Sequence, residues 1–278
     1  MGVKTQIKRI AERFYQLPFI QKPLPQSPFG KNLWAQKESY IKLYKEAISF
    51  NDDKVKAFER DFGFAINLDY WRELALHTQV VIKPEKLNFF HGRLLYSVLS
   101  KYLSERENLE QIKIFETGTA RGFSSVCMAK ALIDRDFPGF ITTIDVIPHD
   151  QRIFWNCIDD HEGPKTRSEL LGKWPEELTR IIFLQGWTSS IIPQIGLNRI
   201  NFAFLDSQHT KKDVLREFDY VSRRQKIGDI IVFDDVTEGI FQGVCEAVEF
   251  ISENYAYDVK KFQFSDSRGY AIAKRNGN

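Results

Sequence analysis

The sequence of 278 residues is poor in cysteine, and its cysteines follow no pattern. Cys127, Cys157 and Cys245 lie far apart and form no CxxC pair. This spacing argues against a disulfide framework and a structural zinc site, because both need cysteines in closely spaced sets. We therefore expect a protein of a reducing compartment, and we predict a cytoplasmic location.

Long apolar runs and a dominant charge are absent as well. No stretch is apolar enough over its length to span a bilayer, and we identify no signal peptide. Gln6 stands where a myristoylation signal needs Ser or Thr. The formal net charge of +2 gives no case for nucleic acid, which would need a concentrated basic face. We predict neither a membrane nor a nucleic-acid partner.

What remains is the composition of a globular protein, with 43% hydrophobic and 27% charged residues. The length predicts one main domain with an extension, which we place at residues 87–278 and 1–86. The extension begins with a basic helical stretch, Lys4–Tyr15, and continues as an extended arm broken by prolines. A helical pattern follows from Leu33 to Leu76. We expect this region to cover the ligand site or to form a homo-oligomer contact.

The most informative stretch reads as a strand, a glycine turn and a helix. An apolar run from Ile112 ends in Glu116, passes Gly118 and Gly122, and enters a helical pattern at Val126–Ile133. Such units bind nucleoside cofactors in open α/β sheets, although an ordinary turn without a ligand is the alternative. The free N–H groups at the helix start would suit an anionic group. The candidate binding residues of this turn are Glu116, Gly118, Thr119, Gly122 and Ser124.

The second strand ends in a candidate binding residue, and a long connection separates it from the third strand. The β-rich run Phe140–Ile144 ends in Asp145, where an acidic residue accepts hydrogen bonds from ribose hydroxyls. A turn or cap is the other interpretation of Asp145. The third strand, Ile181–Leu184, is preceded by an unusually long connection, Val146–Arg180, which we interpret as a lid or substrate-contact element.

Carboxylates follow the next two strands at the same edge of the sheet. Ile200–Leu205 ends in Asp206, and Asp229–Phe233 ends in Asp234 and Asp235. Desolvated carboxylates repel one another unless a cation joins them, so we predict a divalent metal site. Oxygen ligands favour magnesium, calcium or manganese. The alternative is that these residues cap the helices that follow.

Two histidines are candidate site residues. His209 follows Asp206 by three residues, at the start of a helix predicted over Lys212–Gln225. A neutral imidazole can remove a hydroxyl proton near neutral pH, so we predict His209 as a general base assisted by Asp206 and its metal. His91 lies in the helical run Leu87–Leu103, where a packed histidine is the simpler interpretation.

Together these motifs resemble a known family. Glu116-x-Gly118-x-x-x-Gly122, Leu205–His209 and Gly228–Asp235 look like bacterial class I S-adenosylmethionine (SAM)-dependent methyltransferases related to macrocin O-methyltransferase, and more distantly catechol O-methyltransferase. The resemblance covers Leu87 to Lys274. It implies a SAM cofactor, with Gln185, Gly186 and Trp187 near the adenine, although a buried structural role is the alternative for Trp187. It also implies metal ligation, here Mg²⁺, by Asp206, Asp234 and Asp235. Asp235 departs from the catechol enzyme, which has an amide there, and Ser207 stands where glycine is frequent.

The C-terminus agrees with this resemblance. Ile240–Tyr255 reads as a helix, and Tyr257–Phe264 and Gly269–Ala273 read as a terminal hairpin. We therefore predict a Rossmann-like α/β fold whose parallel sheet includes one antiparallel strand from that hairpin. The implied activity is SAM-dependent methylation of a hydroxyl on a small polar acceptor such as a sugar or secondary metabolite. The alternatives are a relative of cephalosporin hydroxylase-type proteins and a non-catalytic nucleotide- or SAM-binding module.

Overall fold

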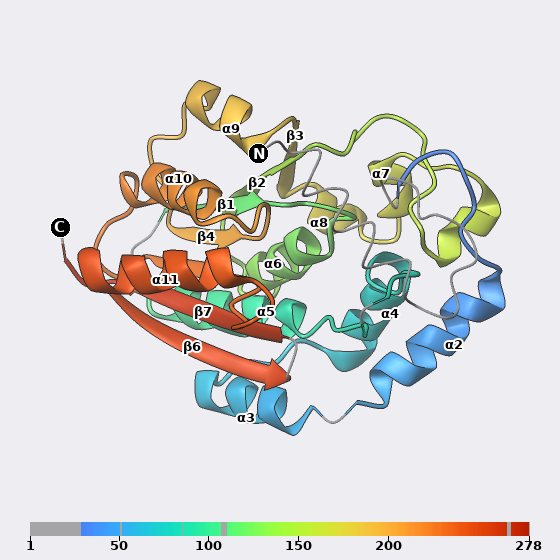
Figure 1. Ribbon diagram of the computed structural model, residues 1–278, viewed down its shortest axis with the longest axis horizontal. Coiled ribbons are helices and arrows are strands. Elements are labelled where there is room, and N and C mark those ends of the chain that lie inside the picture. Colours follow the sequence, from blue (N-terminus) through green and yellow to red (C-terminus); the bar gives the residue numbers. More distant parts are fainter. Residues whose placement is uncertain (1–28, 51, 85, 107–109, 266–267, 278) are drawn as a thin grey trace.

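The structure, a computed structural model, describes residues 29–50, 52–84, 86–106, 110–265 and 268–277. The predicted helix Lys4–Tyr15 and the prolines that follow it lie outside these residues. Seven strands form one sheet in the order β3-β2-β1-β4-β5-β7-β6 (Figure 1). Their bounds are β1 Ile112–Thr117, β2 Gly139–Asp145, β3 Ile181–Gln185, β4 Phe202–Leu205, β5 Ile230–Phe233, β6 Tyr257–Ser265 and β7 Arg268–Arg275.

The first five strands are parallel, and β7 pairs antiparallel with both β5 and β6. The terminal hairpin therefore inserts one antiparallel strand beside β5. This topology confirms the predicted Rossmann-like sheet. The strand positions also agree with the sequence interpretation, because each predicted strand overlaps an observed one.

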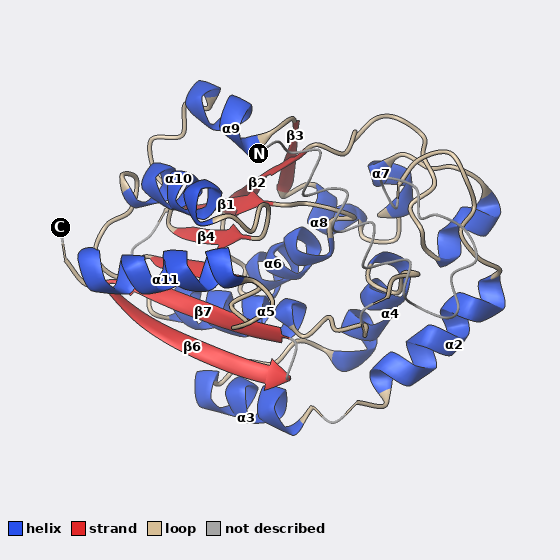
Figure 2. Cartoon of the chain, in the orientation of Figure 1, coloured by secondary structure: helices blue, strands red, loops and turns tan. Residues whose placement is uncertain are grey.

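Side chains of alternating residues build a separate core on each face of the sheet. In β4, Phe202 and Phe204 pack on one face, whereas Ala203 and Leu205 pack on the other. The first face is covered by α5 (His91–Ser104) and α6 (Phe123–Asp134), and the second by α10 (Lys211–Ser222) and α11 (Gln242–Asn254). Figure 2 shows these helices around the red strands. Both faces are buried because the crossover helices cover them.

The predicted helical stretch before residue 87 forms α2 (Lys37–Ile48), α3 (Asp53–Phe62) and α4 (Leu68–Thr78). Their buried side chains belong to the same apolar cluster as α5 and α6. Arg93 of α5 forms ion pairs with Glu59 of α3 and with Asp52. Asp52 stands at the N-cap of α3, but its side chain makes no capping hydrogen bond. The extension is thus packed onto the sheet through a shared core and buried charges.

The connection between β2 and β3 contains three short helices, η1 (Ile158–Glu162), α7 (Arg167–Leu170) and α8 (Pro175–Leu178). It folds against the N-terminal helices, because η1 contacts both α2 and α4. After β3 come α9 (Thr188–Ile191) and η2 (Ile192–Gln194). Among the described residues, no helix combines the length and the apolar character needed to cross a membrane.

Candidate functional site

The turn after β1 contains two glycines with positive φ. Gly118 has a φ of 87°, and a Cβ at this position would lie 1.8 Å from the carbonyl oxygen of Asp206. Gly122 has a φ of 93° and directly precedes α6, and a Cβ there would lie 2.7 Å from Cδ1 of Leu171. A side chain at Gly118 would therefore require the end of β4 to move. The sharp turn predicted at Gly118 is confirmed.

Glu116 fixes the first turn of α6 and is fully buried. Its carboxylate accepts hydrogen bonds from the hydroxyls of Ser124 and Ser125. Burial raises the pKa of Glu116, and the two serine hydroxyls oppose that shift. Glu116 is absent from the lining of both cavities described below. Its direct contact with a cofactor stays a prediction, and the structure gives it a positioning role for Ser124.

A cavity of about 200 Å³ opens between the ends of β1, β2, β3 and β4. Asp145, Gly186 and Trp187, three of the residues proposed to bind the nucleoside of the cofactor, line it. Asp145 accepts backbone hydrogen bonds from Ala120 at 2.6 Å and from Ile147 at 2.8 Å. Trp187 is 60% exposed, which excludes a buried structural role. Gln185 is exposed and does not line either cavity.

A second cavity of about 310 Å³ adjoins the first, and Gly118, Ala120, Asp206 and Ser207 line both. Thr119 and Ser124 also line this larger cavity. Its opposite wall comes mainly from the N-terminal extension, which supplies Gln79, Val81, Ile82 and Lys83. Asn156 of the long connection and Asn88 complete this wall. The extension therefore forms part of the wall of this cavity. This agrees with the first of the two expectations for the extension, which was that it covers the ligand site.

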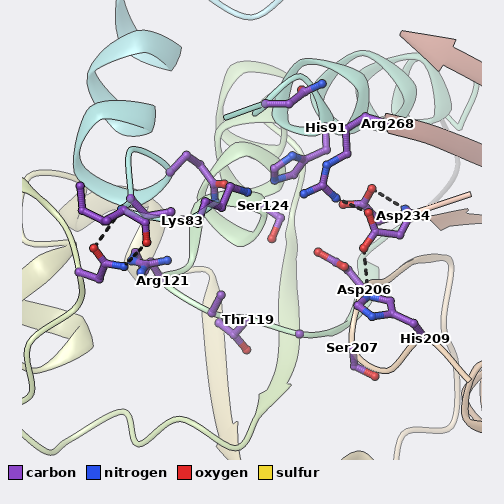
Figure 3. A pocket seen from close by; sticks show the side chains of 18 residues that line it. Lys83, His91, Thr119, Arg121, Ser124, Asp206, Ser207, His209, Asp234 and Arg268 are labelled. Atoms are coloured by element: carbon purple, nitrogen blue, oxygen red, sulfur yellow. Dashed lines mark hydrogen bonds and ion pairs between the residues drawn. The ribbon is translucent and has the colours of Figure 1, made fainter. Parts of the chain in front are cut away.

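Asp206, His209 and Asp235 meet in the larger cavity. Figure 3 shows Asp206 and His209 at one end of it. One potential ligand atom from each lies within 4.8 Å of the others. Nε2 of His209 is 3.0 Å from Oδ2 of Asp235. Asp234, predicted as the third ligand, is not part of this group. One of its oxygens accepts the backbone N–H of Asp235 at 2.6 Å. The cluster thus includes His209 where the sequence analysis had placed Asp234.

Arg268 is the residue of this cluster that the sequence analysis missed. It starts β7 and forms an ion pair with Asp235. Burial, then the charge of Asp235, raises the pKa of Asp234 to about 7, and Arg268 opposes that shift. Burial and the neighbouring carboxylates also raise the pKa of Asp206 well above its usual range. The hairpin therefore supplies a counter-charge that the sequence analysis had assigned to a metal alone.

His91 lies at the start of α5 and also lines the larger cavity. Its ring is 4.8 Å from the ring of Phe123 and 6.3 Å from that of Phe204. Burial, reinforced by Arg268, lowers the pKa of His91 to about 3. His91 is therefore a neutral packed residue near pH 7, in agreement with the simpler sequence interpretation.

The sheet order and the glycine turn are typical of the class I methyltransferase fold. Residues 115–236 match a family model described as a methyltransferase domain. The chain therefore has the fold of class I methyltransferases. No curated protein matches the sequence.

Solved structures share this fold at low sequence identity. The cofactor-bound Rv0187 from MTB is 15% identical, covering 86% of this chain and 97% of its own, with a TM-score of 0.53. The O-methyltransferase TomG from Streptomyces achromogenes, involved in tomaymycin synthesis and solved with SAM, is 16% identical over 100% of both chains, with a TM-score of 0.50. An O-methyltransferase from Bacillus cereus, solved with SAH, is 15% identical over 86% of this chain and 100% of its own, with a TM-score of 0.50.

Proposed function

We propose that this protein transfers a methyl group from SAM to a hydroxyl of a small polar acceptor. The observation that carries the proposal is the pair of adjoining cavities that meet at Gly118 and Asp206. The SAM and SAH complexes of TomG and the Bacillus cereus enzyme support the choice of cofactor. A SAM molecule could span both cavities and leave room beside the acidic cluster for an acceptor.

The residues of the smaller cavity fit the nucleoside of SAM. Asp145 presents a carboxylate that can accept hydrogen bonds from the ribose hydroxyls, and the exposed indole of Trp187 offers a face to the adenine. Thr119 and Ser124 lie toward the methionine end, in the larger cavity. When bound, SAM supplies the electrophilic methyl group. The chain contributes the alignment of acceptor and cofactor, which is mainly a proximity effect.

His209 is our candidate for the general base. Nε2 of His209 faces Asp235, whose carboxylate can orient the imidazole, and Arg268 holds that carboxylate from its other side. A general base in this position would accept the proton of the acceptor hydroxyl and contribute about 10²–10⁴-fold to turnover.

A divalent cation fits the carboxylates of the same cluster. In the described residues, the Asp206 carboxylate has neither an ion pair nor a hydrogen-bond donor, although it is partly buried and lines the cavity. Asp206 and Asp235 could hold Mg²⁺ or Mn²⁺, whose charge would lower the pKa of a bound hydroxyl. His209 cannot ligate a metal and accept a proton through the same nitrogen. We therefore assign the metal to the carboxylates and the proton to His209.

Ligand-dependent thermal unfolding tests the cofactor assignment. SAH at 100 times its dissociation constant should stabilise the protein by about 2.7 kcal/mol, whereas NAD should not. A preference for NAD would contradict the proposal. Methyl transfer from labelled SAM to a panel of hydroxylated acceptors should stop in chelator and return with Mg²⁺ or Mn²⁺. Full activity in chelator would instead leave Arg268 as the sufficient counter-charge.

A further inference from the structure

Arg121 lies in the glycine turn and lines the larger cavity, and no acidic side chain among the described residues forms an ion pair with it. It is only 7% exposed. Its Nε donates to the backbone oxygen of Trp155 at 2.6 Å, and its guanidinium carbon lies 4.6 Å from the centre of the Phe29 ring. Within the described part of the chain, neither Nη nitrogen has a hydrogen-bond partner. Both Nη groups of this buried guanidinium can therefore donate to a ligand in the cavity.

Among the described residues, no carboxylate lies within ion-pair distance of Arg121. The carboxylate of Asp160 acts on it electrostatically but forms no ion pair with it, and instead accepts the backbone N–H groups of Trp155 at 2.7 Å and Cys157 at 3.2 Å. Burial lowers the pKa of Arg121 to about 10, against the opposing influence of Cys157 and Asp160. A buried cation without a counter-ion is costly, so an anion at this place would be stabilising.

The larger cavity has a basic and an acidic end. Figure 3 shows Arg121 and Lys83 at one end, and Asp206, Asp234 and His209 at the other. An anionic group would be repelled by the carboxylates and attracted by the guanidinium of Arg121. The cavity can therefore hold a ligand in one direction, with its anion beside Arg121.

We propose that the two Nη groups of Arg121 bind a carboxylate of the ligand in this cavity. The paired N–H donors of a guanidinium match the two oxygens of a carboxylate. The inference rests on the proposed function, which offers two sources for this group. One is the methionine carboxylate of SAM, and the other is a carboxylate on the acceptor. In the second case the acceptors are hydroxylated carboxylic acids.

Calorimetric titration of the full chain tests the proposal with three probes. The probes are SAH, 5′-methylthioadenosine, which lacks the carboxylate, and 4-hydroxybenzoate added to the SAH complex. The variants are Arg121→Gln and Arg121→Lys. Arg224→Gln is the matched control, because Arg224 also donates Nε to a backbone carbonyl and lies over an aromatic ring, but away from both cavities.

If the carboxylate belongs to SAM, Arg121→Gln weakens SAH binding by about 10- to 100-fold and leaves 5′-methylthioadenosine binding within about twofold. If it belongs to the acceptor, SAH binding is unchanged and 4-hydroxybenzoate binding is lost. Arg121→Lys should restore part of the lost affinity in either case, which a purely structural role would not explain. Circular dichroism confirms that each variant is folded.

Unchanged affinity for both carboxylate probes in Arg121→Gln would overturn the proposal. An equal loss for SAH and 5′-methylthioadenosine would also overturn it, since the effect would then be structural. If the wild type bound neither adenosine ligand, the proposed function would fail. The 4-hydroxybenzoate titration, made without SAH, would still decide whether Arg121 binds a carboxylate.

Discussion

The hydrogen bonds of Asp145 show how neighbouring residues fix the position of a single side chain in the site. Asp145 already holds two backbone N–H groups, from Ala120 and Ile147, yet still lines the smaller cavity. A carboxylate can accept further hydrogen bonds, so these two contacts orient the side chain and leave acceptor sites for a ligand. The turn role and the ribose role, which were alternatives in the sequence, are compatible in the structure.

Asp145→Ala should weaken SAH binding by about 1.5–3 kcal/mol, because it removes a charge-assisted hydrogen bond to the ribose. Calorimetry gives the affinity, and thermal unfolding reports whether the turn is intact. Asp145→Asn is the control for the backbone contacts, since its amide oxygen can keep one of them. An affinity equal to the wild type in a folded Asp145→Ala protein would reduce Asp145 to a turn residue.

His91 predicts a pH dependence of stability. Its pKa is about 3 in the folded protein, below the ordinary value of 6.5 that we assign to the unfolded chain. The unfolded state therefore binds a proton first as the pH falls, so stability is present above about pH 6.5 and declines below it. Between pH 7.5 and 5.0 this histidine should cost at most about 2 kcal/mol.

His91→Phe keeps an aromatic ring and removes the titrating group. Denaturant unfolding at both pH values should show that the variant loses less stability on acidification than the wild type does. His161→Phe, at an exposed position, should keep the wild-type dependence. Parallel stability curves for the wild type and His91→Phe would show that His91 does not titrate in this way.

At the scale of the secondary-structure elements, the site depends on how closely β1 and β4 approach at their ends. Gly118 makes this approach possible, since a Cβ would collide with the backbone of Asp206. Gly118→Ala should destabilise the protein by more than about 1–2 kcal/mol, the cost of the left-handed conformation alone. It should also weaken SAH binding, because the shared wall of both cavities must shift.

Gly239→Ala is the matched control for this substitution. Gly239 also has a positive φ, of 75°, but no heavy atom lies within 4 Å of a Cβ placed there. It should therefore show the conformational cost without the collision. Equal losses in the two variants, measured by urea unfolding, would mean that the contact with β4 has no energetic effect.

The elements of the extension and the long connection matter to the site because they form one wall of it. Asn156 belongs to the connection and accepts hydrogen bonds from Tyr40 and from the backbone of Ile82. Its side chain thus joins three segments that are far apart in the sequence. Residues of both the extension and the sheet domain therefore line the larger cavity.

At the scale of the whole molecule, buried charges tie the extension to the sheet domain. Glu59 and Arg93 are 7% and 1% exposed, and their ion pair joins α3 to α5. Glu59→Gln should destabilise the protein by about 3 kcal/mol, since it leaves a buried guanidinium only partly compensated by Asp52. Denaturant unfolding of the full chain measures this loss.

The comparison for this prediction is an exposed pair that also joins distant segments. Glu73 and Lys173 are 3.0 Å apart, and both side chains are about half exposed. Glu73→Gln should therefore change stability by no more than about 1 kcal/mol. A similarly small effect for Glu59→Gln would indicate that the extension is held by its apolar contacts alone.

The sequence by itself determined the sheet and the positions of its strand ends. Alternation within runs such as Phe202–Leu205 and the glycines of the turn are local signals, because strand geometry and φ depend on neighbouring residues. Asp145 and Asp206 were found for the same reason, since each directly follows a strand. The sequence of parallel strands also predicts that these residues share one edge.

Only the tertiary structure decided which charges meet. Arg268 reaches Asp235 because the terminal hairpin returns beside β5. Arg121 meets the backbone oxygen of Trp155 in the long connection, and no described carboxylate forms an ion pair with it. Such pairings join residues far apart in the chain, so no local pattern records them. The electrostatics of the site are therefore fixed by the packing of distant segments, whereas its position follows from local sequence.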